Sequence, residues 1–324
     1  MRLLAVDDDH FARDLLFGAL ASSGYDDLVM AASGHEALDI LVKTSRPFDA
    51  FLLDIRMPGM DGIELCARIR GMDQYRNAPI LMITAMSERH YIDGAFAAGA
   101  LDYISKPFEA LELGARLRTV ERIVRQNHLV AQGNCEIDRL RSAREPGMAF
   151  DVDGPVEIVD VPRVVGLVAM ENYLLRLTRW MTWQSESVAF TIDGFDTMTR
   201  FATPVEIYDI LSDTADAIVR GLKRDNHLVT YVGNGTFVAV LHRKSSVSDP
   251  DTLMTIQALL DMAEPSLDSG VPCPLNLRVG PVYRPSLIAA GNPLALLTMP
   301  GKTRATTRSP RADAVQPKLV RGFA

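Results

Sequence analysis

Polar side chains follow several predicted strands of this chain at the points where the strands end. Asp7 and Asp8 come directly after an apolar run, and Asp54 ends a second one. Thr84 and Lys106 follow two further apolar runs in the same way. Because the carboxyl ends of parallel strands meet at one edge of a sheet, where ligands of such folds bind, we expect these five side chains to converge.

This combination of residues would suit a divalent cation and a phosphoryl group. Three neighbouring carboxylates repel one another unless a cation joins them, and Mg²⁺ prefers oxygen ligands in octahedral geometry. The lysine offers a point charge to a phosphoryl oxygen, and the threonine offers a hydroxyl donor. Each residue alone also has an ordinary explanation, since Asp8 or Asp9 could cap the following helix and Lys106 could be a solvated charge. Their joint occurrence favours a functional site with Mg²⁺ as its cofactor.

The elements that would position these residues alternate between strand and helix. Short apolar runs predict strands at 3–6, 28–31, 49–53, 79–83 and 101–104. Helical periodicity between them predicts helices at 10–22, 33–43, 63–70 and 89–98, and a long helix after Pro107. Five βα units in succession predict an α/β domain with a doubly wound, five-stranded parallel sheet of the flavodoxin-like kind.

Residues 1–125 resemble the receiver domain of two-component response regulators. The similarity rests on VDDD at 6–9, LLDIRMPGMDG at 52–62, ITA at 83–85 and DYISKPF at 102–108. The resemblance implies that Asp54 accepts a phosphoryl group from a sensor histidine kinase or a phosphotransfer protein. It also implies that Asp7, Asp8 and Asp54 bind Mg²⁺ together with the backbone carbonyl of Arg56.

The resemblance further implies a switch beside this site. Lys106 would bind the phosphoryl group, and its bond to Pro107 would be cis. Thr84 would move to meet the phosphate, and Tyr103 would change rotamer with it. Because phosphorylation adds about −1.5 to −2 charge, this change would alter the surface of the fourth and fifth βα units.

The segment 126–163 is predicted to be a helical linker. The apolar stripe of the preceding helix either ends near Val124, as in an ordinary domain helix, or continues as a signalling helix or dimer seam to Leu140. Residues 142–163 contain several prolines and glycines, which favour a linker over a packed element.

A second, α+β domain is predicted at 164–290. Helical patterns cover 165–183, 205–222 and 253–262, and strand patterns cover 188–192, 228–232, 237–241 and 275–282. The turn Gly233-Asn234-Gly235-Thr236 predicts a hairpin between two of these strands. This part is similar to a GGDEF domain, the fold of diguanylate cyclases, in a degenerate form.

The acids that bind metal in that family are replaced here. Thr236 and Thr191 stand where the resemblance places metal-binding carboxylates, and Gly235 replaces the preceding Asp of the GGDEF hairpin. Asp193 is retained, whereas Thr199 stands at the place of the guanine-contacting Asn. Without the two carboxylates the domain lacks ligands for the metal ions that would offset the charge of a triphosphate. We therefore expect no cyclase activity and a module that acts through protein contacts.

Two alternatives remain for the second domain, namely a cyclic-di-GMP receptor and a weakly active diguanylate cyclase. The receptor depends on Arg224, which is retained from the family's product-binding motif, while His227 takes the place of its acid. A solvated turn is the ordinary explanation of these two residues. Trp180 and Trp183 lie at helical spacing and are better explained by packing than by ligand stacking.

Composition excludes several other classes of protein. The net charge of −7 over 324 residues argues against nucleic-acid binding by a basic body. Six basic residues and one acid after residue 300 give the end of the chain +5, and we expect 291–324 to be a basic, disordered tail without nucleic-acid or membrane contacts. Three dispersed cysteines, an acidic N-terminus and no apolar run of membrane-spanning length predict a cytoplasmic protein. Its expected partners are the kinase, an unidentified downstream protein and a second copy of itself.

Overall fold

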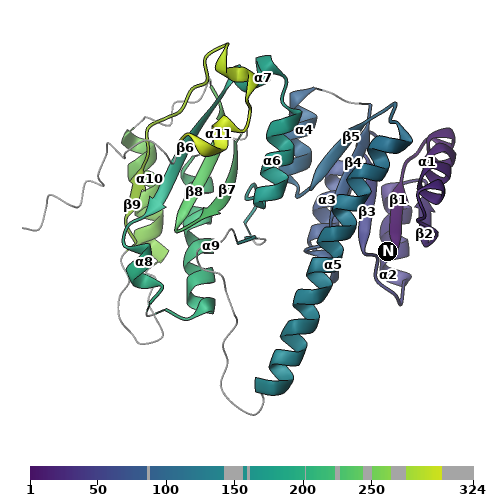
Figure 1. The fold of residues 1–324 in the computed structure, drawn as a ribbon, viewed down its shortest axis with the longest axis horizontal. Helices are drawn as coiled ribbons and strands as arrows, with labels where there is room; N and C mark the ends of the chain where they lie inside the picture. The colour runs from purple at the N-terminus through teal and green to yellow at the C-terminus, as the bar shows by residue number, and fades with distance from the viewer. Residues whose placement is uncertain are drawn as a thin grey trace, which may run out of the picture.

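The computed structural model describes residues 1–85, 88–141, 156–158, 161–200, 202–222, 227–243, 250–263 and 275–300. Its first part is a five-stranded parallel sheet in the order β2-β1-β3-β4-β5 (Figure 1). The strands are β1 (Leu3–Val6), β2 (Leu28–Ala31), β3 (Ala50–Asp54), β4 (Ile80–Thr84) and β5 (Asp102–Ser105). The predicted doubly wound parallel sheet is confirmed.

Helices cover both faces of this sheet, which explains why its strands are almost wholly apolar. On one face α1 and α5 enclose Leu3, Leu52 and Ile83, and on the other α2, α3 and α4 enclose Leu4, Phe51 and Met82. The helices are α1 (His10–Ser22), α2 (Gly34–Lys43), α3 (Gly62–Arg70), α4 (Arg89–Ala97) and α5 (Ala110–Arg141), with a 3-10 turn η1 (Asp73–Tyr75).

Side-chain caps fix the starts of the helices that follow the acidic edge. Asp9 accepts a hydrogen bond from the amide of Phe11 at 2.9 Å and is the N-cap of α1. Asp61 caps α3 by accepting from the amide of Glu64 at 2.7 Å. The expected capping role of Asp9 is therefore confirmed, which leaves Asp7 and Asp8 to face the site.

Cys66 lies in the core between α3 and α4. Its side chain is fully buried, and its thiol donates to the carbonyl of Ala98 at 3.3 Å. Burial raises the pKa of the Cys66 thiol to about 12, against a small opposing effect of Arg70. The folded thiol therefore stays protonated where an unfolded one ionises, and this stabilisation is lost as the pH rises from about 9 towards 12.

We expect Cys66 to resist alkylation in the native protein. Iodoacetamide at about pH 8 reacts with thiolates, and Cys66 offers neither a thiolate nor access to solvent. Peptide mass spectrometry should find Cys66 unmodified in the native chain and alkylated after unfolding in urea. Rapid native labelling of Cys66 would contradict the packing of α3 against α4.

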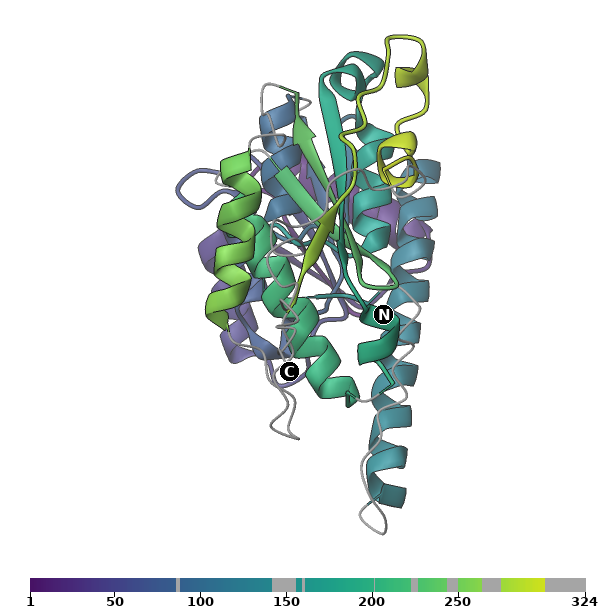
Figure 2. The ribbon, with the colours of Figure 1, turned by 90° about the vertical axis from the view of Figure 1, so that its left-hand side faces the viewer.

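The last helix of the first part is 32 residues long and extends beyond the sheet. Leu113, Leu117, Val120 and Val124 form its buried stripe, and its C-terminal half projects away from both sheets (Figures 1 and 2). The helix continues through the predicted boundary at residue 125 as far as Arg141. Most of the remaining linker, 142–155, lies outside the described residues.

The second part is built on a four-stranded antiparallel sheet in the order β7-β8-β6-β9. Its strands are β6 (Ser185–Ile192), β7 (His227–Gly233), β8 (Thr236–His242) and β9 (Leu277–Val279). Its helical elements are α6 (Leu167–Arg176), α7 (Arg179–Trp183), α8 (Phe195–Met198), α9 (Pro204–Gly221), α10 (Pro250–Ala263), η2 (Ala289–Gly291) and α11 (Ala295–Thr298). The predicted α+β class and the hairpin between β7 and β8 are confirmed.

Two details of the second part differ from the prediction. The expected helix 165–183 is interrupted at Leu177, whose backbone is extended, because Thr178 caps a new helix by accepting from the amide of Met181. The expected disordered tail begins too early, since residues 291–300 are ordered and include α11. Leu296 of α11 is fully buried against the sheet, which provides the burial that a disordered segment lacks. Residues 301–324 lie outside the described part.

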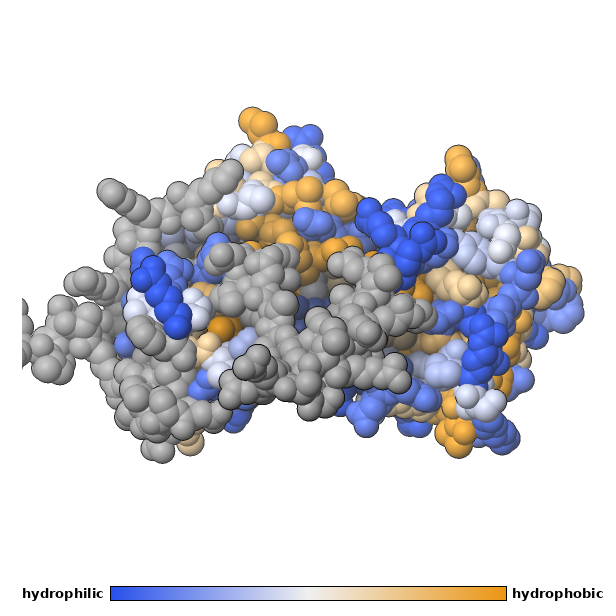
Figure 3. All heavy atoms as spheres, turned by 60° about the horizontal axis from the view of Figure 1, so that its bottom comes forward, coloured by the Kyte–Doolittle hydropathy of each residue, from blue (hydrophilic) through white to orange (hydrophobic). Residues whose placement is uncertain are grey.

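The two sheets share a hydrophobic cluster through α6. This helix lies between α4 and the antiparallel sheet (Figure 1), and one continuous cluster joins Phe96 of α4, Met170 and Leu174 of α6, and Val238 of β8. Other apolar side chains are exposed, and on the face drawn in Figure 3 some form a patch near the upper centre while others are scattered among hydrophilic side chains. Among the described helices, none has both the length and the apolar character needed to cross a bilayer.

Candidate functional site: an acidic cluster at the strand ends

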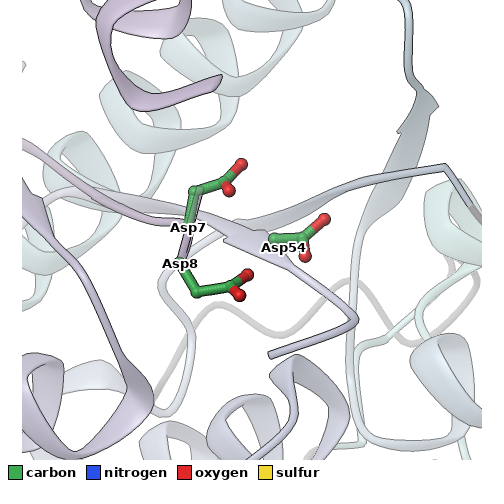
Figure 4. Close-up of side chains that lie close together, drawn as sticks. All are labelled: Asp7, Asp8 and Asp54. Carbon is green, nitrogen blue, oxygen red and sulfur yellow. The ribbon is translucent and has the colours of Figure 1, made fainter. Parts of the chain in front are cut away.

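Three carboxylates meet at the C-terminal edge of the parallel sheet (Figure 4). Asp7 and Asp8 follow β1, and Asp54 is the last residue of β3, the strand that pairs directly with β1. One oxygen from each of the three carboxylates lies within 4.8 Å of the others, and among the described residues this is the only such acidic group. The parallel register thus brings together acids that are 47 positions apart in sequence.

Lys106 contacts two of these acids. Its Nζ lies 2.5 Å from Asp7 Oδ2 and 3.0 Å from Asp54 Oδ1. Asp7 is 2% exposed and Asp54 is 6% exposed, while the lysine side chain keeps 22% of its surface in solvent. The amide of Lys106 donates to the carbonyl of Thr84 at 2.7 Å, which ties the residue to the end of β4, and the Lys106–Pro107 peptide bond is cis.

Burial and charge act in opposite directions on these groups. Burial raises the pKa of Asp54, with a further contribution from Asp7 and Asp8, and Lys106 offsets part of this shift. Burial by itself lowers the pKa of Lys106, but hydrogen bonds to Asp7 and Asp54 outweigh it, and the pKa is raised. One lysine facing three carboxylates leaves an excess of negative charge, which gives the cluster an electrostatic preference for a cation.

Hydrogen bonds that involve the backbone hold the three acids in position. The amide of Arg56 donates to Asp54 Oδ2 at 3.1 Å, and Arg13 donates to the carbonyls of Asp7 and Asp8 at 2.7 and 2.9 Å. The participation of the Arg56 carbonyl stays a prediction. Gly62 was not predicted as a site residue, although a Cβ there would lie 2.0 Å from the carbonyl oxygen of Asp54. Its place in the motif MPGMDG could have drawn attention to it.

The two proposed switch residues lie on the same face of the sheet. Thr84 ends β4 and is buried, and it is level with Ser105 of β5. Tyr103 stands two residues before Ser105, so its side chain points to the same side. The ring of Tyr103 is almost fully buried, and the guanidinium of Arg176 from α6 lies 5.1 Å from its centroid.

Two threonine hydroxyls lie together where β6 pairs with β8 of the hairpin in the second part. Thr191 and Thr236 are paired across β6 and β8, and their hydroxyl oxygens are 3.2 Å apart. Asp193 forms an ion pair with Arg278. The turn residues Gly233, Asn234 and Gly235 have positive φ values of 102°, 50° and 66°.

Three candidate residues of the second domain remain, of which the structure describes two. Arg224 lies outside the described residues. His227 was expected on a solvated turn, but it is the first residue of β7 and is 3% exposed, because β8 pairs with the strand from this residue onward. Thr199 is the C-cap of α8, and its hydroxyl donates to the carbonyl of Asp196.

Comparison with known proteins agrees with this geometry. The family model of the response regulator receiver domain matches residues 3–118. Response regulator MprA of Mycobacterium tuberculosis is 41% identical over 122 residues, which cover 38% of this chain and 51% of that protein. Transcriptional regulatory protein YvrH of Bacillus subtilis is 42% identical over 116 residues, covering 36% of this chain and 47% of that protein.

One solved structure with similarity is the chemotaxis response regulator CheY4 of Vibrio cholerae. It is 34% identical, with 38% of this chain and 97% of that chain covered and a TM-score of 0.34. The chain spans about half the length of the curated relatives it matches. With the family match and the strand-end cluster together, residues 3–118 are a response regulator receiver domain.

Proposed function

We propose that the protein is a response regulator in which Asp54 accepts a phosphoryl group from a phosphohistidine of a sensor histidine kinase or phosphotransfer protein. The observation that carries this proposal is the contact of Lys106 with both Asp7 and Asp54 beside an otherwise acidic cluster. The phosphoryl donor is inferred from the receiver domain alone, because the curated relatives are matched over only about half their length.

The transfer is a displacement at phosphorus. An Asp54 carboxylate oxygen forms a bond to phosphorus as the P–N bond of the phosphohistidine breaks, and the imidazole leaves with the electron pair of that bond. Two anionic groups repel each other during this approach, and Lys106 lies where its charge can offset the repulsion. Buried Asp7 orients the lysine, and the amide of Arg56 orients the carboxylate.

A magnesium ion fits the donor set of this site. The three carboxylate oxygens lie close enough to share one cation, and hard oxygen ligands are those that Mg²⁺ prefers. Asp7, Asp8 and Asp54 would hold the ion, which when bound supplies positive charge that stabilises the transferring phosphoryl group.

The test is labelling of the purified protein with acetyl phosphate and Mg²⁺. We expect phosphate to appear on Asp54, detected by intact mass, and no label to form when EDTA is present from the start of the incubation. Asp54→Ala should take up no label. Absence of label on the wild-type chain, or equal labelling of Asp54→Ala, would refute the proposal.

For the second domain we propose a degenerate GGDEF-like module without cyclase activity that acts through protein contacts. The hydroxyls of Thr191 and Thr236 contact each other where metal-binding acids would be needed, and Asp193 is neutralised by Arg278. The amide of Gly235 is already donated to the hydroxyl of Tyr231 at 3.0 Å, so this turn has one donor fewer for a phosphate. Incubation with GTP and Mg²⁺ should yield no cyclic-di-GMP, and any turnover would refute this part.

A further inference from the structure

The end of the second part that carries α7 and η2 exposes several large apolar side chains. Ile288 is 86% exposed, the highest value of any large apolar residue in the described part of the chain, and Trp180 and Leu287 are each more than half exposed. Trp180 belongs to α7, and Leu287 and Ile288 directly precede η2, which packs beside α7. This turn projects beyond the end of the antiparallel sheet (Figures 1 and 2). We call Trp180, Leu287 and Ile288 the apolar tip.

The backbone of the turn that carries this tip is hydrogen-bonded internally. The amides of Ala289 and Ala290 donate to the hydroxyl and to the carbonyl of Ser286, at 3.2 and 2.8 Å. The carbonyl of Leu287 accepts the Nε of Arg179 at 2.9 Å, which ties the turn to α7. Burying a polar group costs most when the group loses water without gaining another partner. This turn can therefore enter an apolar environment with little loss of hydrogen bonding.

Two aromatic rings and an arginine stand in a row beside the turn. The rings of Trp180 and Trp183 stack with centroids 4.7 Å apart, and the guanidinium of Arg243 lies 5.1 Å from the centroid of the Trp183 ring. Trp183 is half-buried, whereas Trp180 is exposed. A tryptophan has an apolar body and a polar N–H, which suits it to a boundary between water and an apolar phase. The row therefore places an exposed aromatic ring at the tip with a positive charge near it.

The segments that carry the apolar tip contain basic residues and no acids. In 177–185 and 280–300 the charged residues are Arg179 and Arg284, without any Asp or Glu. Arg284 is neutralised by the buried Glu186 at 2.8 Å, whereas Arg179 is exposed and its Nε is bound to a neutral carbonyl. An apolar tip with guanidinium groups beside it matches a surface that is negatively charged outside and apolar beneath.

We propose that the apolar tip inserts into the interface of an anionic membrane, with the guanidinium groups of Arg179 and Arg243 among the lipid headgroups. A peptide partner would need a groove or a free sheet edge at this place, whereas a fluid bilayer can receive a projecting turn. The arginine side chains can keep their charge in the polar layer while their stems lie against apolar groups. Such binding is peripheral, and it does not depend on phosphorylation of Asp54.

The test uses the full chain, whose two tryptophans both lie in α7 and report on the tip. Vesicles of phosphatidylcholine and phosphatidylglycerol in equal amounts should sediment with the protein and shift tryptophan emission to shorter wavelength, because Trp180 leaves water. Lipids brominated on the acyl chains should quench this emission. Vesicles of phosphatidylcholine alone should bind at least about tenfold more weakly, because each arginine near an anionic surface contributes about fivefold.

Substitutions separate insertion of the tip from attraction to charged lipid. Ile288→Asp should lower the affinity for the mixed vesicles at least about tenfold, because it removes an inserted apolar side chain and adds negative charge. Ile288→Ser, which adds no charge, should lower the affinity about fivefold or more. Arg243→Gln should lower it about fivefold on the mixed vesicles only. The matched control Val42→Asp introduces the same charge at a 79% exposed apolar residue of α2, in the first part of the chain, and should bind as the wild type does.

The vesicle measurements can have three results. Binding to the mixed vesicles with an emission shift, lost in Ile288→Asp and kept in Val42→Asp, supports the inference. Binding without an emission shift, or with equal affinity in Ile288→Asp and the wild type, would overturn it and place the lipid contact elsewhere in the chain, for example in the basic segment 301–324. Absence of binding to either kind of vesicle would also overturn it, and the apolar tip would then be assigned to a protein partner. Ile288→Ser keeps the test decisive should Ile288→Asp fail to fold.

Discussion

Lys106→Met should lower the free energy of unfolding of the receiver domain by about 3 kcal/mol at about pH 7 without Mg²⁺, because it leaves two buried carboxylates without their cation. The value is at the lower end for a broken buried pair, since the lysine is partly exposed. The same change should slow labelling of Asp54 by acetyl phosphate about 100-fold, as removal of one charge-stabilising group does elsewhere. Native-state hydrogen exchange in β1 and β3 measures the first effect, and intact mass against time measures the second.

The pH dependence of this variant follows from the carboxyl groups. Burial raises the pKa of Asp54, and Lys106 opposes this shift, so removing Lys106 should raise the pKa further. A folded-state pKa above the unfolded one favours the protonated form, so the penalty should shrink as the pH falls towards the usual range of an aspartate and grow as the pH rises. Lys43→Met, which removes an exposed lysine near Asp39, should change stability by no more than about 0.5 kcal/mol. Equal effects of the two substitutions would refute the role assigned to Lys106.

Gly62→Ala should destabilise the receiver domain by about 3 kcal/mol, the upper end for overpacking a core. A Cβ at Gly62 would lie 2.0 Å from the carbonyl oxygen and 2.8 Å from the carbonyl carbon of Asp54, which are backbone atoms of a central strand and cannot rotate away. The amide of Gly62 also donates to the carbonyl of Ile55 at 2.8 Å, so moving α3 would break that bond. Urea denaturation, with the release of Cys66 to alkylation as a local signal, measures the effect.

Gly18→Ala provides the matched control. Gly18 lies in the exposed part of α1, and no atom lies within 4 Å of the position that a methyl group would take there. Alanine at this position should therefore be neutral or stabilise by up to about 1 kcal/mol. Similar destabilisation by both substitutions would indicate that general helix effects, and not the close approach to Asp54, determine the result.

The receiver fold could be predicted from the sequence because each strand is a short, nearly continuous apolar run that ends in a polar residue. The parallel arrangement then dictates that Asp7, Asp8 and Asp54 meet at one edge, and the structure places them there. Gly62 could not be predicted in this way, because its importance depends on the distance between α3 and β3, which no periodicity encodes.

The second domain was harder to predict, for reasons that concern tertiary contacts. Leu177 and Thr178 interrupt a helical pattern whose apolar stripe continues to Met181, and the signal for the break is only a weak Thr cap. The sequence assigns His227 to a polar turn because three polar residues precede it, whereas pairing with β8 buries it. Arg89 and Arg176 have the pattern of surface charges, and their contacts with Met181 and with Tyr103 exist only because the two parts of the chain pack together.

The continuous apolar cluster through α6 also limits how this chain can be divided. A fragment ending after residue 125 would expose to water the face of α4 around Phe96 that Met170 and Tyr173 cover in the whole chain. Such a fragment should associate with itself or require a replacement for α6, and exchange of the second half for that of another regulator would also require a redesigned α4 surface.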